Sequence, residues 1–190
     1  MTTMQSARKS QRSRHVAPEQ RMPTDPAPTS PDLSAAFRRT MGRLASTVGV
    51  LTVARHGGDL QGMTVSPIVR LPEAEPSLAV AFRSDTRTLA QVMANGAFAI
   101  SILRDDQAPI AEAMSRPGED RTHLMPLFDE SGGIPVVREA LAVIWCDARE
   151  SFVLSNTTMV VGAVQRVEVR DDNPLIHFRG ALRPLGQLDG

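Results

Sequence analysis

The sequence predicts a mainly β fold, an antiparallel β-barrel into which a few helices are inserted. Six or seven short apolar segments rich in β-branched residues have the length and pattern of strands. The helical segments occur singly and do not follow every strand, so the βαβ alternation of a doubly wound fold is absent. No Gly-x-Gly-x-x-Gly motif follows any strand, which removes support for a Rossmann nucleotide site. An antiparallel barrel with added helices fits this order.

The first half of the domain is expected to alternate helices with strands and hairpins. Ser34 is a suitable N-cap for a helix that carries Phe37, Met41 and Leu44 on one stripe. Gly96 is a suitable stop for a later short helix. The expected elements are a helix from Ser34, strands over 48–54, 60–65 and 77–82, a helix over 85–94, a strand over 97–103 and a helix over 105–114, with a turn at 56–59.

The second half is expected to be a long loop followed by strands. Residues 115–135 are rich in Gly, Pro and charged residues, which is typical of a loop. Three β-branched segments then predict strands over 140–149, 158–170 and 175–178.

The composition predicts one soluble domain of residues 32–190, preceded by a disordered tail of residues 1–31. The tail has five Pro, five Lys or Arg and almost no large apolar residues, so it cannot bury enough surface to offset its ordering entropy. A transit peptide is the weaker alternative, because Pro is frequent and no amphipathic helix is visible. Lys9, in the tail, is the only lysine, so the domain uses Arg for every permanent cation.

Charge and cysteine content exclude several classes of function. The net charge is zero, which gives no reason to expect nucleic acid or a membrane surface as a partner. No apolar run approaches the roughly 18 residues of a membrane span. The four histidines are scattered, so no metal site is expected. The single cysteine, Cys146, favours a reducing, cytoplasmic location, and its apolar neighbours place it in the core.

Two polar stretches are candidates for a ligand site. In the first, Gly62–Pro67, a predicted strand ends in small and hydroxyl residues, which allow a flat ring to approach the backbone. In the second, Ser84–Thr88, hydroxyl groups and the guanidinium of Arg87 lie at a helix N-terminus and could bind phosphate. Asp85 would repel phosphate and could instead cap the helix. The alternatives without a ligand are an ordinary strand end for the first stretch and, for the second, a capped surface helix with a solvated Arg.

Motifs along residues 35–186 resemble the flavin reductase-like family, the small reductase components of two-component flavin monooxygenases. Their order and spacing carry the resemblance: FRRTMGRLASTVGVLTV, GMTVSPIVRL, SLAVAFRSDTRTL, GAFAISILRDDQAPIAEAM, LAVIWCDARE, TTMVVGAVQRVEV and PLIHFRGALRPLG. The resemblance implies an FMN-binding split barrel, a homodimer, FMN or FAD as the flavin, NADH or NADPH as reductant, and a partner monooxygenase.

The resemblance also implies which residues bind the flavin. Those that match the segment contacting the isoalloxazine ring are Thr64, Val65, Ser66 and Pro67. Those that match the segment around the ribityl chain and phosphate are Phe82, Ser84, Asp85, Thr86, Arg87 and Thr88. Those that match a further flavin-contacting region are Ala113, Met114, Ser115 and Arg121.

Some positions depart from the family pattern. Pro67 stands where a second Ser is usual, and Asn156 stands before Thr157 where a His is common near the nicotinamide. An amide can only hydrogen-bond, whereas an imidazole can also stack. His177 lies where the final strand often carries Tyr; it is expected either at the strand's rim or in contact with flavin or nicotinamide. These departures concern nicotinamide binding more than flavin binding.

The implied reaction is hydride transfer from C4 of NAD(P)H to N5 of the flavin. No proton is removed from carbon, so no general base is required and no catalytic side chain is assigned. Two alternatives remain open: a flavoenzyme that acts on another small substrate, and a non-catalytic flavin-binding protein.

Overall fold

The computed structural model describes residues 30–55, 59–72 and 75–187. The chain divides into two units between Phe37 and Arg38, and helix α1 (Ser30–Met41) crosses this boundary. The predicted start at Ser34 is wrong: the helix begins at Ser30, inside the predicted tail, and the rest of that tail lies outside the described residues. Asp32 in the first turn and Arg38 in the last complement the helix dipole.

A seven-stranded antiparallel sheet forms most of the second unit and confirms the predicted mainly β class. Its strand order is β3-β2-β6-β9-β10-β5-β4, and it stays open, with β3 and β4 at its edges, as in a split barrel. In chain order its strands are β2 (Gly49–Thr52), β3 (Gly62–Val65), β4 (Val69–Leu71), β5 (Ser77–Arg83), β6 (Ala97–Ile102), β9 (Ala142–Leu154) and β10 (Thr157–Val169).

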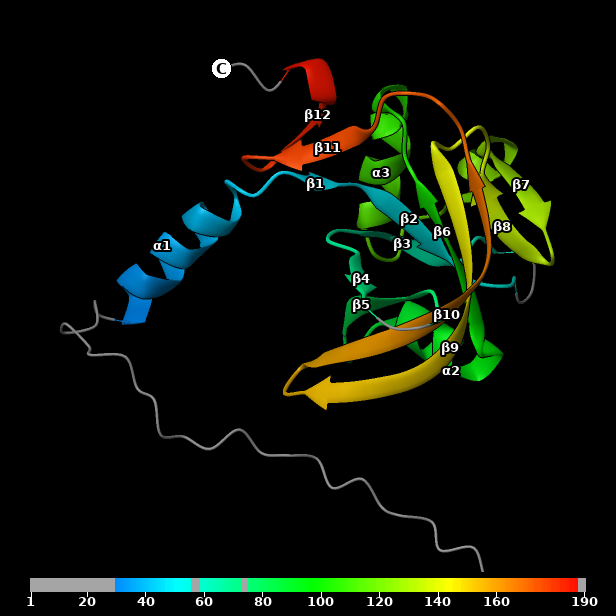
Figure 1. The fold of residues 1–190 in the computed structure, drawn as a ribbon, viewed down its shortest axis with the longest axis horizontal. Coiled ribbons are helices and arrows are strands. Elements are labelled where there is room, and N and C mark those ends of the chain that lie inside the picture. Colours follow the sequence, from blue (N-terminus) through cyan, green and yellow to red (C-terminus); the bar gives the residue numbers. More distant parts are fainter. Residues whose placement is uncertain (1–29, 56–58, 73–74, 188–190) are drawn as a thin grey trace, which may run out of the picture. The chain divides into compact units, whose positions relative to one another are not determined.

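Two smaller sheets and short helices complete the described fold (Figure 1). A three-stranded sheet has the order β1-β11-β12, and β7 pairs with β8 as a separate hairpin. The bounds are β1 (Ser46–Thr47), β7 (Phe128–Ser131), β8 (Ile134–Val137), β11 (Leu175–Phe178), β12 (Ala181–Pro184), α2 (Arg87–Asn95), α3 (Ala108–Ser115), and the 3₁₀ turns η1 (Asp105–Gln107), η2 (Thr122–Leu127) and η3 (Leu185–Gln187). None of the helices described is both long and apolar enough to cross a lipid bilayer.

The central part of the large sheet is buried on both faces, which explains the continuous apolar residues of β2, β6 and the first half of β9. Side chains alternate between two core clusters, so Trp145 belongs to one cluster and the adjacent Cys146 to the other. The first cluster includes residues of α3 and the β7–β8 hairpin, and the second includes residues of α2 and β5. Cys146 is therefore a core residue, as predicted, and burial raises the pKa of its thiol to about 12.

The helix over 85–94 was predicted two residues too early. It starts at Arg87 because Thr86 is its N-cap: the Thr86 hydroxyl accepts a hydrogen bond from the Leu89 N–H. The suggestion that Asp85 caps the helix is wrong, since its carboxylate pairs with Arg83 at 2.7 Å. Gly96 ends the helix as predicted, with its N–H donating to the Val92 carbonyl.

The predicted loop over 115–135 is wrong in its second half, and other strands, including β1, were missed or cut short. Residues 122–127 form η2, and β7 and β8 form a hairpin around Gly132 and Gly133, which have φ of 61° and 80°. Two adjacent left-handed residues suit a two-residue hairpin turn, and Gly-Gly between apolar segments was the available signal. Strands β4 and β12 were not predicted, and β9 continues to Leu154 instead of ending at Arg149.

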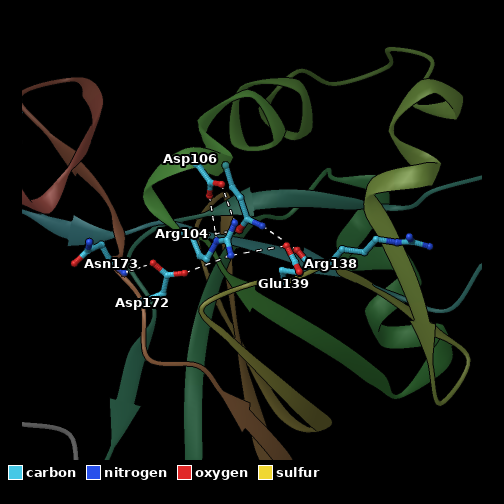
Figure 2. A network of polar contacts seen from close by, with 7 residues as sticks. Arg104, Asp106, Arg138, Glu139, Asp172 and Asn173 are labelled. Carbon is cyan, nitrogen blue, oxygen red and sulfur yellow. Dashed lines mark hydrogen bonds and ion pairs between the residues drawn. The ribbon is translucent and has the colours of Figure 1, made fainter.

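A network around Arg104 joins three parts of the chain at the end of β6 (Figure 2). Its guanidinium forms two hydrogen bonds with the Asp106 carboxylate, of 2.7 and 3.1 Å. It also lies 3.3 Å from Asp172, in the β10–β11 connection, and 3.9 Å from Glu139, just before β9. The backbone N–H of Arg104 donates to the side-chain oxygen of Gln107, and the side-chain nitrogen of Gln107 donates to the Arg138 backbone carbonyl. This network holds connections in place around a cation whose charge is fully compensated.

Candidate functional site

A cavity of about 840 Å³ lies among three segments of the second unit. The first segment, 59–63, leads into β3; the second, 85–88, begins α2; the third runs from Met114 at the end of α3 through the connection to Thr122. Arg83 and Met125 complete the lining. The volume falls within the range of small-molecule and cofactor sites.

The start of α2 forms one wall of the cavity and carries Arg87, whose charge could bind an anion. Arg87 is exposed, lines the cavity, and has no hydrogen-bond or ion-pair partner among the described residues. Arg83 differs, because its charge is neutralised by Asp85. The backbone N–H groups of the first helical turn also point toward this end, where the helix dipole favours an anion. The arrangement can bind a phosphate group.

Gly62, at the start of β3, links the other two segments. A Cβ atom at this position would lie 2.3 Å from the Leu51 carbonyl oxygen, so no side chain fits between β2 and β3 here. The Gly62 carbonyl accepts a hydrogen bond from Arg121 Nη1 at 2.7 Å and one from Thr88 Oγ1 at 3.4 Å. The small residue singled out in the sequence is thus required by close strand packing as well as by the cavity it lines.

The connection after α3 forms the third wall, and its charged groups are engaged with each other or with the backbone. Asp120 accepts hydrogen bonds from the hydroxyl and N–H of Thr122, which lower the pKa of its carboxyl. Glu119 pairs with Arg116 at 3.6 Å. Within the described residues Arg121 donates only to backbone carbonyls. Burial lowers the pKa of its guanidinium, an effect that Glu119 partly offsets.

The structure brings together about half of the predicted flavin-binding residues. Those that line the cavity are Asp85, Thr86, Arg87, Thr88, Met114, Ser115 and Arg121. Those that do not are Thr64, Val65, Ser66, Pro67, Phe82, Ser84 and Ala113.

The second group adjoins the cavity walls or supports them. The Thr64 hydroxyl donates to the Ala111 carbonyl at 2.6 Å and so joins β3 to α3. Val65 and Phe82 are buried in the core. Ser66 lies within 2.7 Å of the Ser46 hydroxyl, on the side of the three-stranded sheet.

The predicted nicotinamide residues also lie outside the cavity lining, in two separate places. Asn156 is in the turn between β9 and β10, where its carbonyl accepts the Ser84 N–H at 2.9 Å. Thr157 begins β10, and the next residue, Thr158, hydrogen-bonds the Ser84 hydroxyl. His177 is in β11, paired with Ser46 of β1. The turn with Asn156 therefore contacts the segment that precedes Arg87, while His177 belongs to the other sheet.

Sequence reasoning missed the lining contributed by 59–61, by 117–120 and by Met125. Residues 117–120 were assigned to an unstructured loop, and nothing in their composition shows that Arg121 folds that loop back onto β3. Asp59 and Gln61 come just before β3, and the turn predicted over 56–59 falls on residues of which only Asp59 is described.

Comparison with known proteins agrees with the resemblance seen in the sequence. The model of the "flavin reductase like domain" family matches residues 41–186, about three quarters of the chain. The chain belongs to the flavin reductase-like family. The reductase component of 4-hydroxyphenylacetate 3-monooxygenase from Thermus thermophilus is 31% identical, over 80% of this chain and 97% of the relative.

Two further relatives support the family assignment. The reductase component of 4-nitrophenol 4-monooxygenase/4-nitrocatechol 2-monooxygenase from Rhodococcus opacus is 30% identical, over 77% of this chain and 78% of its own length. The solved structure of the flavin reductase PheA2 superposes with a TM-score of 0.69 at 25% identity, covering 80% of this chain and 98% of that one. The open antiparallel sheet is therefore the fold of flavin reductases.

The cavity fits a flavin nucleotide on the evidence of its own residues. It has the volume for a ring system and chain. At a helix N-terminus it has the Arg87 guanidinium, which no described residue pairs with, for the phosphate. Met63, Met114 and Met125 supply apolar, adaptable surface for a flat ring.

Proposed function

We propose that this protein is an NAD(P)H:flavin oxidoreductase that transfers hydride from NADH or NADPH to FMN or FAD and supplies reduced flavin to a partner monooxygenase. The observation that supports this most directly is the cavity between the start of α2 and the end of α3. Arg87 lies at one end of it and has no partner in the part of the chain that the structure describes. The relatives from Thermus thermophilus and Rhodococcus opacus, both reductase components of monooxygenases, support the partner.

The residues of the chain bind and orient; they do not transfer protons to carbon. Bound flavin supplies the hydride acceptor, and the protein aligns it with the nicotinamide. Arg87 and the N–H groups of the first α2 turn hold the phosphate, while the Thr86 hydroxyl keeps that turn in shape through its bond with Leu89.

Nicotinamide binding involves Asn156, Thr157 and His177 in this proposal. The turn holding Asn156 is joined to Ser84, one residue from the cavity-lining Arg83 and Asp85, which supports its placement beside bound flavin. His177 lacks any such link to the cavity within the described chain.

The test is oxidation of NADH and of NADPH by the purified protein with added FMN, FAD or riboflavin. Oxidation that depends on both flavin and protein is expected. Quenching of flavin fluorescence without oxidation of either nicotinamide would instead identify a flavin-binding protein, the reading favoured by the separation of His177 from the cavity.

The proposal includes a homodimer with each flavin site near the subunit interface. Strand β9 pairs with β6 only as far as Asp147, so its last residues form a sheet edge. That edge carries Phe152, Val153 and Leu154, which are 51%, 70% and 61% exposed. A long apolar edge strand is a site for pairing with another chain. The turn that follows it holds the Ser84 segment next to the cavity.

Light scattering on the purified protein tests this part of the proposal. A dimer is expected, and Val153→Asp should shift it toward monomer. A stable monomer that reduces flavin at the full rate would contradict the dimer. A cytoplasmic location, supported by the single buried cysteine, belongs to the same proposal.

A further inference from the structure

Arg121 joins three backbone segments with one side chain. Its Nη1 donates to the Gly62 carbonyl of β3 at 2.7 Å. Its Nη2 donates to the carbonyls of Met114 and Arg116, at 3.3 and 3.0 Å, on either side of the last residue of α3. The end of α3, the connection that follows it and the start of β3 therefore share a single planar donor.

The contacts replace a missing helix cap. Helix α3 ends without a glycine: its C-cap residue, Arg116, has an extended backbone, and its N–H makes only a long bond of 3.4 Å to Ala113. The last carbonyls of a helix lack partners within the helix and carry a partial negative charge. Arg121 donates to one of them, Met114, from the following connection.

The arginine's own charge is not paired with a carboxylate among the described residues. The two nearest acids in sequence are engaged elsewhere, Glu119 with Arg116 and Asp120 with Thr122. The Nε atom is buried and has no hydrogen-bond partner. Both terminal nitrogens point at backbone carbonyls, so the side chain is oriented for holding the backbone.

The Gly62 carbonyl is where two cavity walls meet. Besides Arg121, it accepts a bond from the hydroxyl of Thr88, in the first turn of α2. Thr88 is buried and directly follows Arg87. One oxygen thus sets the spacing between the phosphate-binding start of α2 and the wall formed by 114–122.

We infer that Arg121 is a positioning residue, which holds the 114–122 wall of the cavity against Gly62 and thereby sets the width of the ring-binding part of the site, without binding the flavin phosphate. This inference rests on the proposed function. The family resemblance implied that Arg121 contacts the flavin; in this inference Arg87 acts on the phosphate and Arg121 acts on the backbone around the ring.

The test compares FMN with riboflavin, which lacks the phosphate. In Arg121→Ala, the KM for FMN and the KM for riboflavin should both rise about tenfold. The value of kcat at saturating flavin should stay within about twofold. The reason is that hydrogen bonds from a charged donor to the backbone are lost, while no contact with the ligand is lost. Limited proteolysis should cut the 116–121 connection faster. Arg121→Lys should restore only part of the affinity for either flavin, because an ammonium cannot reproduce the planar fork.

Arg138→Ala is the matched control. It removes a cation that is paired with Asp129 at 2.9 Å, and Arg138 lies outside the cavity lining and the 114–122 wall. Both KM values should stay within about twofold of the unmodified protein.

A rise in KM for FMN alone would overturn the inference and assign Arg121 to the phosphate; unchanged KM values for both flavins would also overturn it. If Arg121→Ala does not fold, the ratio of the two KM values in Arg121→Lys decides in the same way. Failure of the unmodified protein to oxidise NADH or NADPH would overturn the proposed function, which is a separate result.

Discussion

The regions around Arg104 and Arg121 both centre on an arginine, but the two arginines have different partners and different roles. Arg104 is surrounded by three carboxylates, those of Asp106, Asp172 and Glu139, and lies outside the cavity. Arg121 contacts three carbonyls and no carboxylate of the described chain, and it lines the cavity. Arg104, paired with carboxylates, joins loops, whereas Arg121, which faces backbone carbonyls, holds the backbone beside the ligand site. The difference lies in the partners, which no count of arginines reveals.

The largest effect on stability is expected at Gly62, whose carbonyl oxygen accepts a hydrogen bond from Arg121. Gly62→Ala places a Cβ within 2.3 Å of the Leu51 carbonyl, so β2 and β3 must separate. We expect a loss of about 3 kcal/mol in the free energy of unfolding, measured by urea denaturation. Gly186→Ala is the control, since a Cβ there meets no atom within 4 Å; it should change stability by less than about 0.5 kcal/mol. Equal effects of the two changes would refute the close-approach argument.

The next effect concerns the second cation of the cavity, Arg87. Arg87→Ala should weaken FMN binding by about 1.5–3 kcal/mol, the range for hydrogen bonds to charged groups, and leave riboflavin almost unchanged. Arg87→Lys should recover part of the loss. Fluorescence titration measures both ligands. Arg83→Ala is the comparison variant: its charge is already paired with Asp85, so a smaller loss is expected. Equal weakening of FMN and riboflavin would show that Arg87 shapes the loop instead.

A smaller effect on stability is expected for the other region, at Arg104. Arg104→Met leaves Asp106, Asp172 and Glu139 without their shared cation, which should lower the free energy of unfolding by about 1–2 kcal/mol. The KM for FMN should not change, because the network lies outside the cavity lining. Thermal unfolding and steady-state kinetics on one preparation check both statements. If Arg104→Met raised the KM for FMN as much as Arg121→Ala does, the Arg104 region would also shape the ligand site, which would contradict the difference between the two regions.

The smallest effect is expected at Cys146, which belongs to neither region. Burial raises the pKa of its thiol to about 12, against about 8.5 for an unfolded cysteine. Below pH 8.5 the thiol is protonated in both states, so it adds no pH dependence. Above that pH only the unfolded chain loses the proton, so the free energy of unfolding falls as pH rises. At pH 8 thiol labelling should occur only on unfolding; labelling at the rate of an exposed thiol would contradict the burial.

Sequence patterns predicted those parts of the fold that depend on local chemistry. The apolar, β-branched segments became strands, and Gly96 ended α2. The extra length of β9 had a signal in the apolar Phe152–Leu154, but the charged residues of 147–150 interrupt the apolar pattern before it. The strand continues across them because this stretch pairs with β10. The β7–β8 hairpin had a signal in Gly132-Gly133, but the charged residues around it favoured a loop.

By itself the sequence determined the fold class and the family and predicted an anion site at the start of α2, because strand periodicity, helix capping and motif order are properties of neighbouring residues. Only the tertiary structure decided which residues share the cavity. It turned Thr64 toward Ala111, placed Thr88 and Arg121 on one carbonyl, and put His177 in a separate sheet. The physical reason is that Arg87, Arg104 and Arg121 carry the same charge and donors. Their roles differ through partners up to 68 residues away in sequence, as between Arg104 and Asp172, which come together only when the strands pair.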